Sequence, residues 1–291
     1  MLKKIKVGSR ESRLAVLQSK IIIDIIKKNC PEYEVELVTM KTTGDKILNK
    51  TLDKVGGKGL FIKELDFALL NGEADITVHS LKDIPMVIDE RLPLAAFTKC
   101  ESPYDVLILP KGVSEPDFSK PVGSSSMRRN IQFKKLFPEA EVKPIRGNVI
   151  TRLDKLDKGE YSALILAEAG ITRLGLEERI NRVFSEKEII PAAGQGVIAV
   201  QKRKEDDFDF FKFINDTNSE IRSKAERAFV RELDGGCSSP AAAFAELSGD
   251  EIEIIGFYAD ENIYEVQQIK GKSCDAEKLG AELAQRIKRG I

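Results

Sequence analysis

The sequence predicts an α/β protein made of two similar α/β units followed by a smaller α+β unit at the C-terminal end. Its 291 residues leave room for two domains and a small third one, since a domain usually contains on the order of 150 residues. Strand-like and helix-like segments alternate twice along the first two thirds of the chain. From about residue 217 the order changes to a helix, several alternating strands and a terminal helix.

The first unit has a βαβαβ order, which its alternating and helical hydrophobic spacings indicate. The expected elements are a strand over 3–7, a helix from Ser12, a strand over about 34–41, a helix stopped by Asn71-Gly72 and a strand over about 75–79. Strands connected in this way run parallel, and ligands bind beyond their carboxyl ends. Gly8-Ser9-Arg10 and Ser80-Leu81-Lys82-Asp83 both fall at those ends.

A second alternating unit begins after Cys100-Glu101-Ser102-Pro103. Its expected elements are a strand over 105–109, a turn at Gly123 to Ser126 that leads into a helix, a strand over 141–145, a helix over 148–157 and a strand over 161–166. The segment Gly194 to Gln201 reads as one further strand, which either stays in this unit or crosses back into the first. The third unit is expected to contain a helix ending at Gly235-Gly236, strands over about 242–269 and a helix from about 275.

The composition excludes several classes of function. Lys and Arg number 46 against 47 Asp and Glu, so the net charge is -1 and no general basic surface for nucleic acid is expected. The single histidine, His79, excludes a zinc site built from several histidines and is expected to be structural. Four cysteines without a C-x-x-C pair indicate a reducing compartment. The first residues hold no signal-peptide core and no apolar run is long enough to span a bilayer, so we expect a cytoplasmic protein without a membrane partner.

Five arginines follow the ends of three successive expected strands in the second unit: Arg128, Arg129, Arg146, Arg152 and Arg173. The turn from Gly123 to Arg129 offers backbone N–H groups, hydroxyls and two guanidiniums to an anion. Because neighbouring residues on a helix point about 100° apart, Arg128 and Arg129 would share only a large polyanionic ligand. The pattern predicts a cleft for several carboxylates or phosphates. The alternative is a set of solvated helix-start charges and surface ion pairs.

Asp83 and Cys237 are the candidates for acid–base and covalent chemistry. Asp83 lies beside Lys82 just past a strand, where a carboxylate can accept a proton or stabilise a developing cation. A capping or turn role before Ile84-Pro85 is the alternative. Cys237 stands in a glycine-rich loop at an expected domain junction, and exposure in such a loop favours reactivity.

Two glycine-rich motifs match nucleotide-binding loops only weakly. In Gly56-Gly57-Lys58-Gly59 the lysine is followed by glycine instead of the Ser or Thr that holds magnesium, which counts against a phosphoryl transferase. We expect a flexible lid over a cleft there, with Lys54 and Lys58 supplying positive charge. Gly194-Gln195-Gly196 is a weaker dinucleotide signal and predicts a hinge.

Taken together, these motifs resemble the porphobilinogen deaminase family, also called hydroxymethylbilane synthases, of tetrapyrrole and heme biosynthesis. The resemblance rests on six motifs in order: Gly8 to Ala15 with Gln18, Lys54 to Phe61, Val78 to Pro85, Gly123 to Arg129, Arg146 to Asn148, and Glu232 to Cys237. It runs nearly from end to end, although the C-terminal third carries fewer motifs.

The resemblance implies a transferase that condenses four porphobilinogen molecules onto a covalent dipyrromethane primer and then releases the linear tetrapyrrole hydroxymethylbilane by hydrolysis. Cys237 matches the cysteine that holds this cofactor by a thioether, and Asp83 matches the catalytic aspartate. The implied partners are porphobilinogen and the growing polypyrrole chain, with no metal, nucleotide, nucleic acid or membrane and with a monomeric enzyme. A non-enzymatic binding protein for a small polyanionic ligand is the alternative.

The resemblance also assigns further residues and a domain division. Cofactor binding falls to Lys82, Ser124, Ser126, Arg128, Arg129 and Arg146, and substrate binding to Arg10, Ser12, Gln18, Ser80, Arg152, Arg173 and Gln195. The lid contains Lys54, Gly56, Gly57, Lys58 and Phe61. Two domains like those of periplasmic binding proteins, 1–98 with 195–213 and 102–191, would enclose a cleft, and a small α+β domain over 217–291 would carry the cysteine loop.

Overall fold

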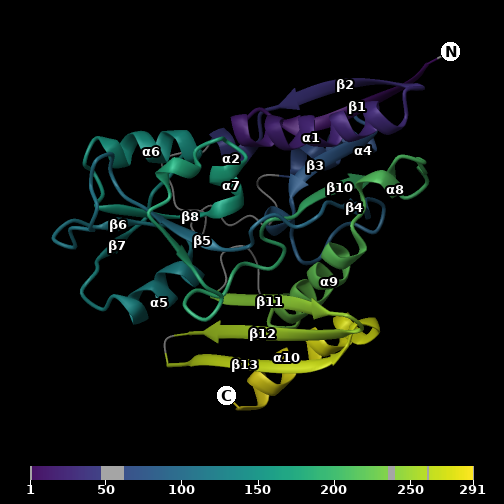
Figure 1. Ribbon diagram of the computed structural model, residues 1–291. Helices are drawn as coiled ribbons and strands as arrows, with labels where there is room; N and C mark the ends of the chain where they lie inside the picture. Colours follow the sequence, from purple (N-terminus) through teal and green to yellow (C-terminus); the bar gives the residue numbers. More distant parts are fainter. Residues whose placement is uncertain (1, 47–61, 235–239, 261, 291) are drawn as a thin grey trace.

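The computed structural model describes residues 2–46, 62–234, 240–260 and 262–290. Its strands form two five-stranded sheets and one three-stranded sheet, and helices accompany all three (Figure 1). The predicted α/β architecture with a smaller C-terminal α+β part is confirmed.

The first sheet has the strand order β2-β1-β3-β10-β4. Its strands are β1 (Lys3–Arg10), β2 (Tyr33–Met40), β3 (Ile76–Ser80), β4 (Leu94–Phe97) and β10 (Ile198–Lys202), with helices α1 (Arg13–Asn29), α2 (Thr43–Lys46), α4 (Lys63–Leu70) and α8 (Phe211–Ile214). Strand β1 pairs parallel with β2 and β3, which confirms the predicted βαβαβ order. The Ser12 hydroxyl caps α1 by accepting a hydrogen bond from the Ala15 backbone N–H.

Strand β10 belongs to this first sheet although it comes after the second sheet in the chain. It pairs antiparallel with β3 on one side and with β4 on the other. Ile198 and Val200 pack in the same buried cluster as Ile76 and Val78. The strand expected between 194 and 201 therefore crosses back to the first sheet. The full division into three domains stays a prediction.

The second sheet has the order β7-β6-β8-β5-β9. Its elements are β5 (Asp105–Ile108), β6 (Val122–Gly123), α5 (Met127–Leu136), β7 (Val142–Lys143), α6 (Val149–Asp157), β8 (Ala163–Ala167), α7 (Glu168–Thr172), a short 3-10 helix η2 (Glu177–Arg179) and β9 (Arg182–Phe184). The strand expected over 105–109 is present as β5, and it pairs antiparallel with both β8 and β9. The parallel set is β6, β7 and β8.

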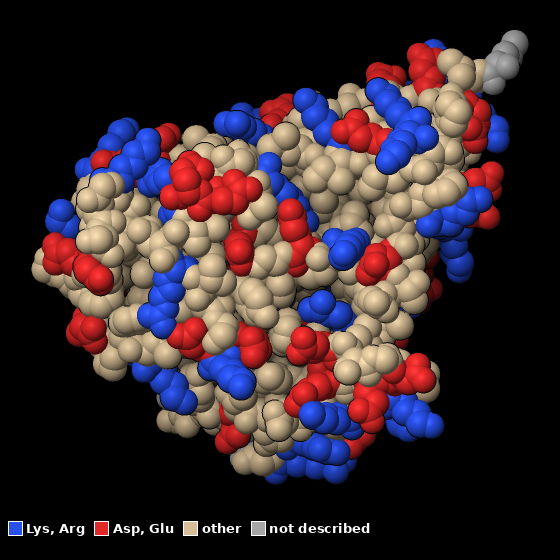
Figure 2. Space-filling model, viewed as in Figure 1, with Lys and Arg blue, Asp and Glu red and all other residues tan. Residues whose placement is uncertain are grey.

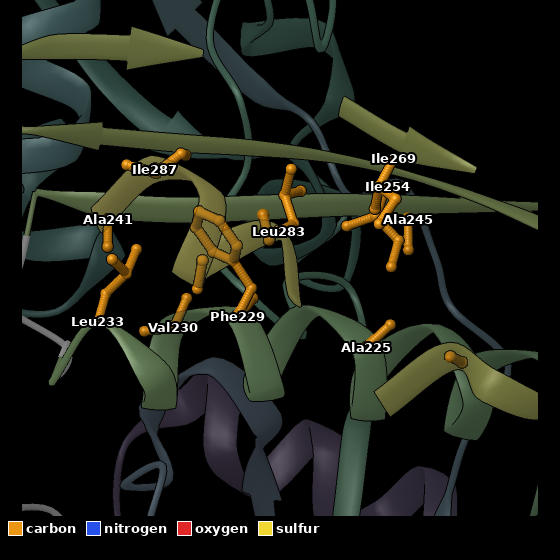
Figure 3. Packing of buried hydrophobic residues seen from close by; sticks show 14 of the residues in the cluster. Ala225, Phe229, Val230, Leu233, Ala241, Ala245, Ile254, Ile269, Leu283 and Ile287 are labelled. Atoms are coloured by element: carbon orange, nitrogen blue, oxygen red, sulfur yellow. The ribbon is translucent and has the colours of Figure 1, made fainter. Parts of the chain in front are cut away.

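The third sheet is an antiparallel meander of β11 (Ala241–Ser248), β12 (Glu251–Ala259) and β13 (Tyr264–Lys272). Helices α9 (Thr217–Glu232) and α10 (Ala276–Gly290), the latter preceded by the 3-10 turn η3 (Ser273–Asp275), pack against it. Figure 3 shows Phe229 of α9 and Leu283 of α10 pointing toward each other beside the sheet, in a core with Ile254. Helix α9 also lies next to the first sheet at β4 (Figure 1).

Charged side chains of both signs are interspersed over the face of the molecule in Figure 2. This distribution agrees with the nearly balanced composition. Among the described helices, none has the length and apolar character that crossing a membrane requires.

Candidate active site

Gln195 lies where the two large sheets meet and connects residues from both. Its Oε1 accepts hydrogen bonds from Lys82 Nζ and from Arg129 Nη2, each at 3.3 Å. Its Nε2 donates to Asp105 Oδ1 at 3.0 Å and to the Pro103 carbonyl at 2.6 Å. The side chain is buried, with 2% of its surface exposed. Gln195 therefore links the end of β3 with β5 and α5 in one polar network.

Two glycines hold Gln195 in place. Gly194 and Gly196 have φ values of +74° and +90°, a region that residues with a Cβ rarely adopt. A Cβ on Gly196 would lie 2.7 Å from the Glu101 carbonyl oxygen, and one on Gly194 would lie 2.6 Å from Leu81 Cγ. The motif that the sequence suggested as a hinge is thus a closely packed turn in this structure.

Asp105, at the start of β5, pairs with both adjacent arginines of α5. Arg128 Nη1 lies 2.6 Å from Asp105 Oδ2, and Arg129 Nη2 lies 2.6 Å from Asp105 Oδ1. All three side chains are buried. Burial would raise the pKa of the Asp105 carboxyl, but the two guanidiniums outweigh it and hold this pKa well below its usual range.

The expectation that Arg128 and Arg129 would share only a large polyanionic ligand is wrong. One internal carboxylate joins them, because its two oxygens face different guanidiniums. The shared charge of Asp105 neutralises only one of the two cations. Arg129 also reaches Gln195, so it remains part of the polar network.

Lys82 and Asp83 lie in the single 3-10 turn η1 (Leu81–Asp83) that follows β3. Loss of solvent and, secondarily, the charge of Arg129 lower the pKa of Lys82 to about 8, whereas the charge of Asp83 opposes this shift. The lysine is therefore mostly protonated at neutral pH. Asp83 is half-buried, and it lies close enough to Arg152 to favour the charged form of the Arg152 guanidinium.

Arg146 and Arg152, from the next strand-to-helix turn, approach the same place. Arg152 Nε donates to the Gly147 carbonyl at 2.8 Å, which fixes the guanidinium at the N-terminal end of α6. Burial and, secondarily, the charges of Arg129 and Arg146 lower the pKa of Arg152 to about 10. Each of these cations makes the charged form of the others less favourable. An anion with several carboxylates would offset this repulsion and so would bind favourably here.

Further predicted residues line the neighbouring ends of β1 and β3. Gln18 of α1 and Ser80 exchange hydrogen bonds, with 2.8 Å from Gln18 Nε2 to Ser80 Oγ. Burial, and secondarily the charge of Arg10, lowers the pKa of His79 to about 4. The His79 ring contacts Thr77 Oγ1 at 2.9 Å, so this histidine is neutral and structural, as predicted.

Three predicted binding serines serve local structure. Ser12 and Ser126 accept hydrogen bonds from backbone N–H groups as the N-caps of α1 and α5, which satisfies donors at the start of each helix. Ser124 Oγ accepts a hydrogen bond from the Ser126 backbone N–H at 3.4 Å. These contacts leave hydroxyl donors for a ligand at the turn.

Arg173 contacts Glu101 and the backbone next to Gln195. Its Nε lies 2.6 Å from Glu101 Oε2, and its Nη2 donates to the Gly196 carbonyl at 2.6 Å. The side chain lines a cavity of about 580 Å³ together with Ile21, Ile25 and Phe213. Cys237 and the lid residues Lys54, Gly56, Gly57, Lys58 and Phe61 lie outside the described residues.

Sequence reasoning missed Asp105 and Arg227. A charged residue at the head of the apolar run 106–109 could have signalled Asp105, because a buried carboxylate needs a cationic partner. Arg227, on α9, donates to the carbonyls of Ile84 and Pro85 directly after Asp83, and its position in the sequence gave no sign of this contact. In the part of the chain that the structure describes, no group of His, Cys, Asp and Glu could hold a metal ion.

Comparison with solved structures finds weak similarity to binding proteins. A periplasmic aliphatic sulphonate binding protein of Escherichia coli is 10% identical, with 80% of this chain and 71% of that chain covered and a TM-score of 0.43. A methionine binding protein is 13% identical, with 72% and 88% covered and a TM-score of 0.46.

Comparison of sequences finds much closer relatives. The family description "Porphobilinogen deaminase, dipyromethane cofactor binding domain" matches residues 5–209, and "Porphobilinogen deaminase, C-terminal domain" matches residues 221–289. The porphobilinogen deaminase of Acetivibrio thermocellus is 59% identical over 99% of both chains. That of Alkaliphilus oremlandii is 57% identical over 98% of this chain and 97% of its own. The chain therefore belongs to the porphobilinogen deaminase family.

Proposed function

We propose that this chain is a transferase of the hydroxymethylbilane synthase type, which adds four porphobilinogen molecules to a dipyrromethane on Cys237 and releases the linear tetrapyrrole by hydrolysis. The observation that carries the proposal is the placement of Asp83 beside Lys82, in the turn after β3, and Arg152, in α6. The cations would bind the carboxylates of the substrate. The Asp83 carboxylate would stabilise the positive charge that forms transiently on the substrate during the reaction.

The donor set fits a dipyrromethane, whose two pyrroles carry acetate and propionate groups. Lys82, Arg129, Arg146 and Arg152 influence one another electrostatically, so bound carboxylates would relieve their mutual repulsion. We assign cofactor binding to Lys82, Ser124, Ser126, Arg128, Arg129 and Arg146. When bound, the dipyrromethane would supply the pyrrole carbon to which the first unit is joined, and each later unit would be joined to the terminal pyrrole of the growing chain.

Asp83 would act on the incoming substrate. As ammonia leaves porphobilinogen, the Asp83 carboxylate would stabilise the positive charge shared by the methylene carbon and the pyrrole nitrogen, and it would manage the N–H proton. Substrate binding is assigned to Arg10, Ser12, Gln18, Ser80, Arg152, Arg173 and Gln195, and covering of the site to the lid with Lys54, Gly56, Gly57, Lys58 and Phe61. Arg173 is proposed to join only in later stages of elongation, because it is paired with Glu101.

We propose further that the enzyme works as a cytoplasmic monomer. Free thiols at Cys30, Cys100 and Cys274 support a reducing compartment. A binding protein for a polyanion remains the competing function, and covalent chemistry at Cys237 separates the two.

The test is the intact denatured mass of the wild type, of Cys237→Ser and of the control Cys274→Ser, which removes an exposed thiol. The wild type and the control should carry an excess of two linked pyrrole units, and Cys237→Ser should carry none. Asp83→Asn should keep the adduct yet turn over at least about 100-fold more slowly, since acid–base groups contribute this much. A wild type that gains no adduct even after incubation with porphobilinogen would establish the binding protein instead.

A further inference from the structure

Helix α9 of the third unit contacts the two segments that carry Asp83 and Gln195. Arg227, which is 8% exposed, donates from Nη1 to the Ile84 carbonyl at 3.1 Å and from Nη2 to the Pro85 carbonyl at 2.5 Å. These carbonyls follow Asp83 directly in the chain. The contact therefore reaches the segment that sets where the Asp83 side chain points.

Glu226, the residue before Arg227, holds the other segment. Its Oε2 accepts a hydrogen bond from the Gly194 N–H at 2.8 Å, and its Oε1 accepts one from the Ala245 N–H of β11 at 3.0 Å. Gly194 precedes Gln195, which binds Lys82 and Arg129. Neighbouring residues on a helix point about 100° apart, so one turn of α9 can reach both segments.

Apolar packing joins the same two segments to the third core. Ala193 is a buried member of the cluster around Phe229 of α9, and Met86 packs against that cluster. Figure 3 shows Phe229 and Ala225 of this helix turned toward the sheet, so the helix is fixed on that side. Burial of two charged side chains is unfavourable unless they form hydrogen bonds. Here each of the four hydrogen bonds of Glu226 and Arg227 named above goes to a backbone group. The two side chains therefore hold the Asp83 and Gln195 segments in fixed positions relative to α9.

We infer that Glu226 and Arg227 are positioning residues for the deamination chemistry, and that α9 sets the geometry of Asp83 relative to Gln195. The inference rests on the catalytic role proposed for Asp83. Arginine suits this task because its planar guanidinium can bind two acceptors in a fixed orientation, which lysine cannot do. The same helix ends at Glu232, shortly before Cys237, so it also begins the loop of the proposed cofactor anchor.

The test compares Arg227→Lys with the control Arg231→Lys on the same helix. Arg231 is about half exposed and pairs with Glu277 of α10 at 2.8 Å, away from both segments. Arg227→Lys should keep the cofactor mass and the KM for porphobilinogen, while kcat falls at least about tenfold, because small misplacement of a catalytic group slows the chemical step. Arg231→Lys should match the wild type. Glu226→Asp, whose shorter side chain cannot span both N–H groups, should lower kcat in the same way.

A double-mutant cycle with Asp83→Asn separates positioning from general stabilisation. If Arg227 acts through Asp83, adding Arg227→Lys to Asp83→Asn should lower kcat by less than about twofold more, whereas independent effects would multiply. A wild-type kcat for Arg227→Lys, or multiplied losses in the double variant, would overturn the inference. A wild-type kcat for Asp83→Asn would instead overturn the proposed function of Asp83.

Discussion

Lys82 carries a charge that depends on how much solvent and how many carboxylates surround it. Partial burial beside Arg129 lowers its pKa to about 8. A bound carboxylate would stabilise the ammonium and raise this pKa again. The free enzyme and the loaded enzyme therefore differ in the pH at which this cation is lost.

We predict that incorporation of the dipyrromethane into the cofactor-free protein slows above about pH 8, since Lys82 becomes neutral there and no longer attracts the carboxylates of the pyrroles. In the protein that already carries the cofactor, kcat/KM for porphobilinogen should begin to decline only at higher pH. The measurements are the rate of adduct formation by intact mass and steady-state pH profiles, each for the wild type and Lys82→Arg. The arginine should remain charged and move the alkaline decline of adduct formation upward. An unmoved decline would show that another group is responsible.

At the scale of residues, the sequence pointed to Lys82, Asp83 and the recurring arginines because each stands next to a recognisable strand end. It did not reveal that Asp105 pairs with both Arg128 and Arg129, nor that Gln195 accepts a hydrogen bond from Lys82. Two partners of Gln195, Arg129 and Lys82, are 66 and 113 residues away in the chain, so no local spacing records these contacts.

Strand β5 and helix α5 are joined by a buried ion triad. Asp105 begins the strand, and Arg128 and Arg129 lie in the first turn of the helix. Arg128 also donates to the Ile190 carbonyl and Arg129 to the Ile165 carbonyl. The triad thus fixes the end of the helix at which the proposed carboxylate site begins.

Asp105→Asn should destabilise the cofactor-free protein by about 3–5 kcal/mol, because it leaves two buried guanidiniums without their counter-charge. Denaturant unfolding measures this change. The control is Glu282→Gln, which removes the exposed pair with Arg286 and should cost less than about 1 kcal/mol. Equal effects of the two substitutions would contradict the role given to Asp105.

At the scale of elements, strong periodicity made α1, α9 and α10 predictable. Strands β4 and β9 were not predicted, and the direction of β5 was not evident, because short apolar runs do not indicate which neighbour a strand will pair with. Strand β6 contains only Val122 and Gly123, too few residues for an alternating pattern.

The Glu226 carboxyl, which links α9 and β11 to the segment before Gln195, is costly to ionise. Burial raises the pKa of Glu226 from its ordinary 4.5 to about 7, although Arg222 and two backbone N–H groups oppose this. A raised pKa in the folded state means that Glu226 favours folding most below about pH 4.5, and that this contribution is lost as pH rises through 7.

We predict that the stability of the wild type relative to Glu226→Gln decreases between about pH 5 and pH 8. Each pKa unit corresponds to about 1.4 kcal/mol, so the change could reach about 3 kcal/mol. Thermal or denaturant unfolding of both proteins across this pH range measures the difference in their free energies of unfolding. Other groups titrate equally in both proteins, so their contributions cancel in this difference. A difference that is constant or grows with pH would show that the pKa of Glu226 is not raised in the folded protein.

At the scale of the whole molecule, the sequence predicted three units but left the strand after Gly194 between two sheets. The hydrophobic pattern of this strand is compatible with a buried position in either sheet, so the pattern alone could not assign the strand to one of them. The family resemblance led to the crossing that β10 makes. The mutual placement of α9 and the Asp83 segment depends on contacts between distant residues, and it became visible only in the structure.

The position of β10 between β3 and β4 affects how the protein can be made on the ribosome. Synthesis runs from the N-terminus, and β3 keeps an open edge until Ile198 to Lys202 have been added. Translation at about 5–20 residues per second makes this interval several seconds or longer. An unpaired strand edge invites association with other chains. We therefore expect the nascent N-terminal segment to depend on chaperones most during synthesis, while the edge of β3 is still unpaired.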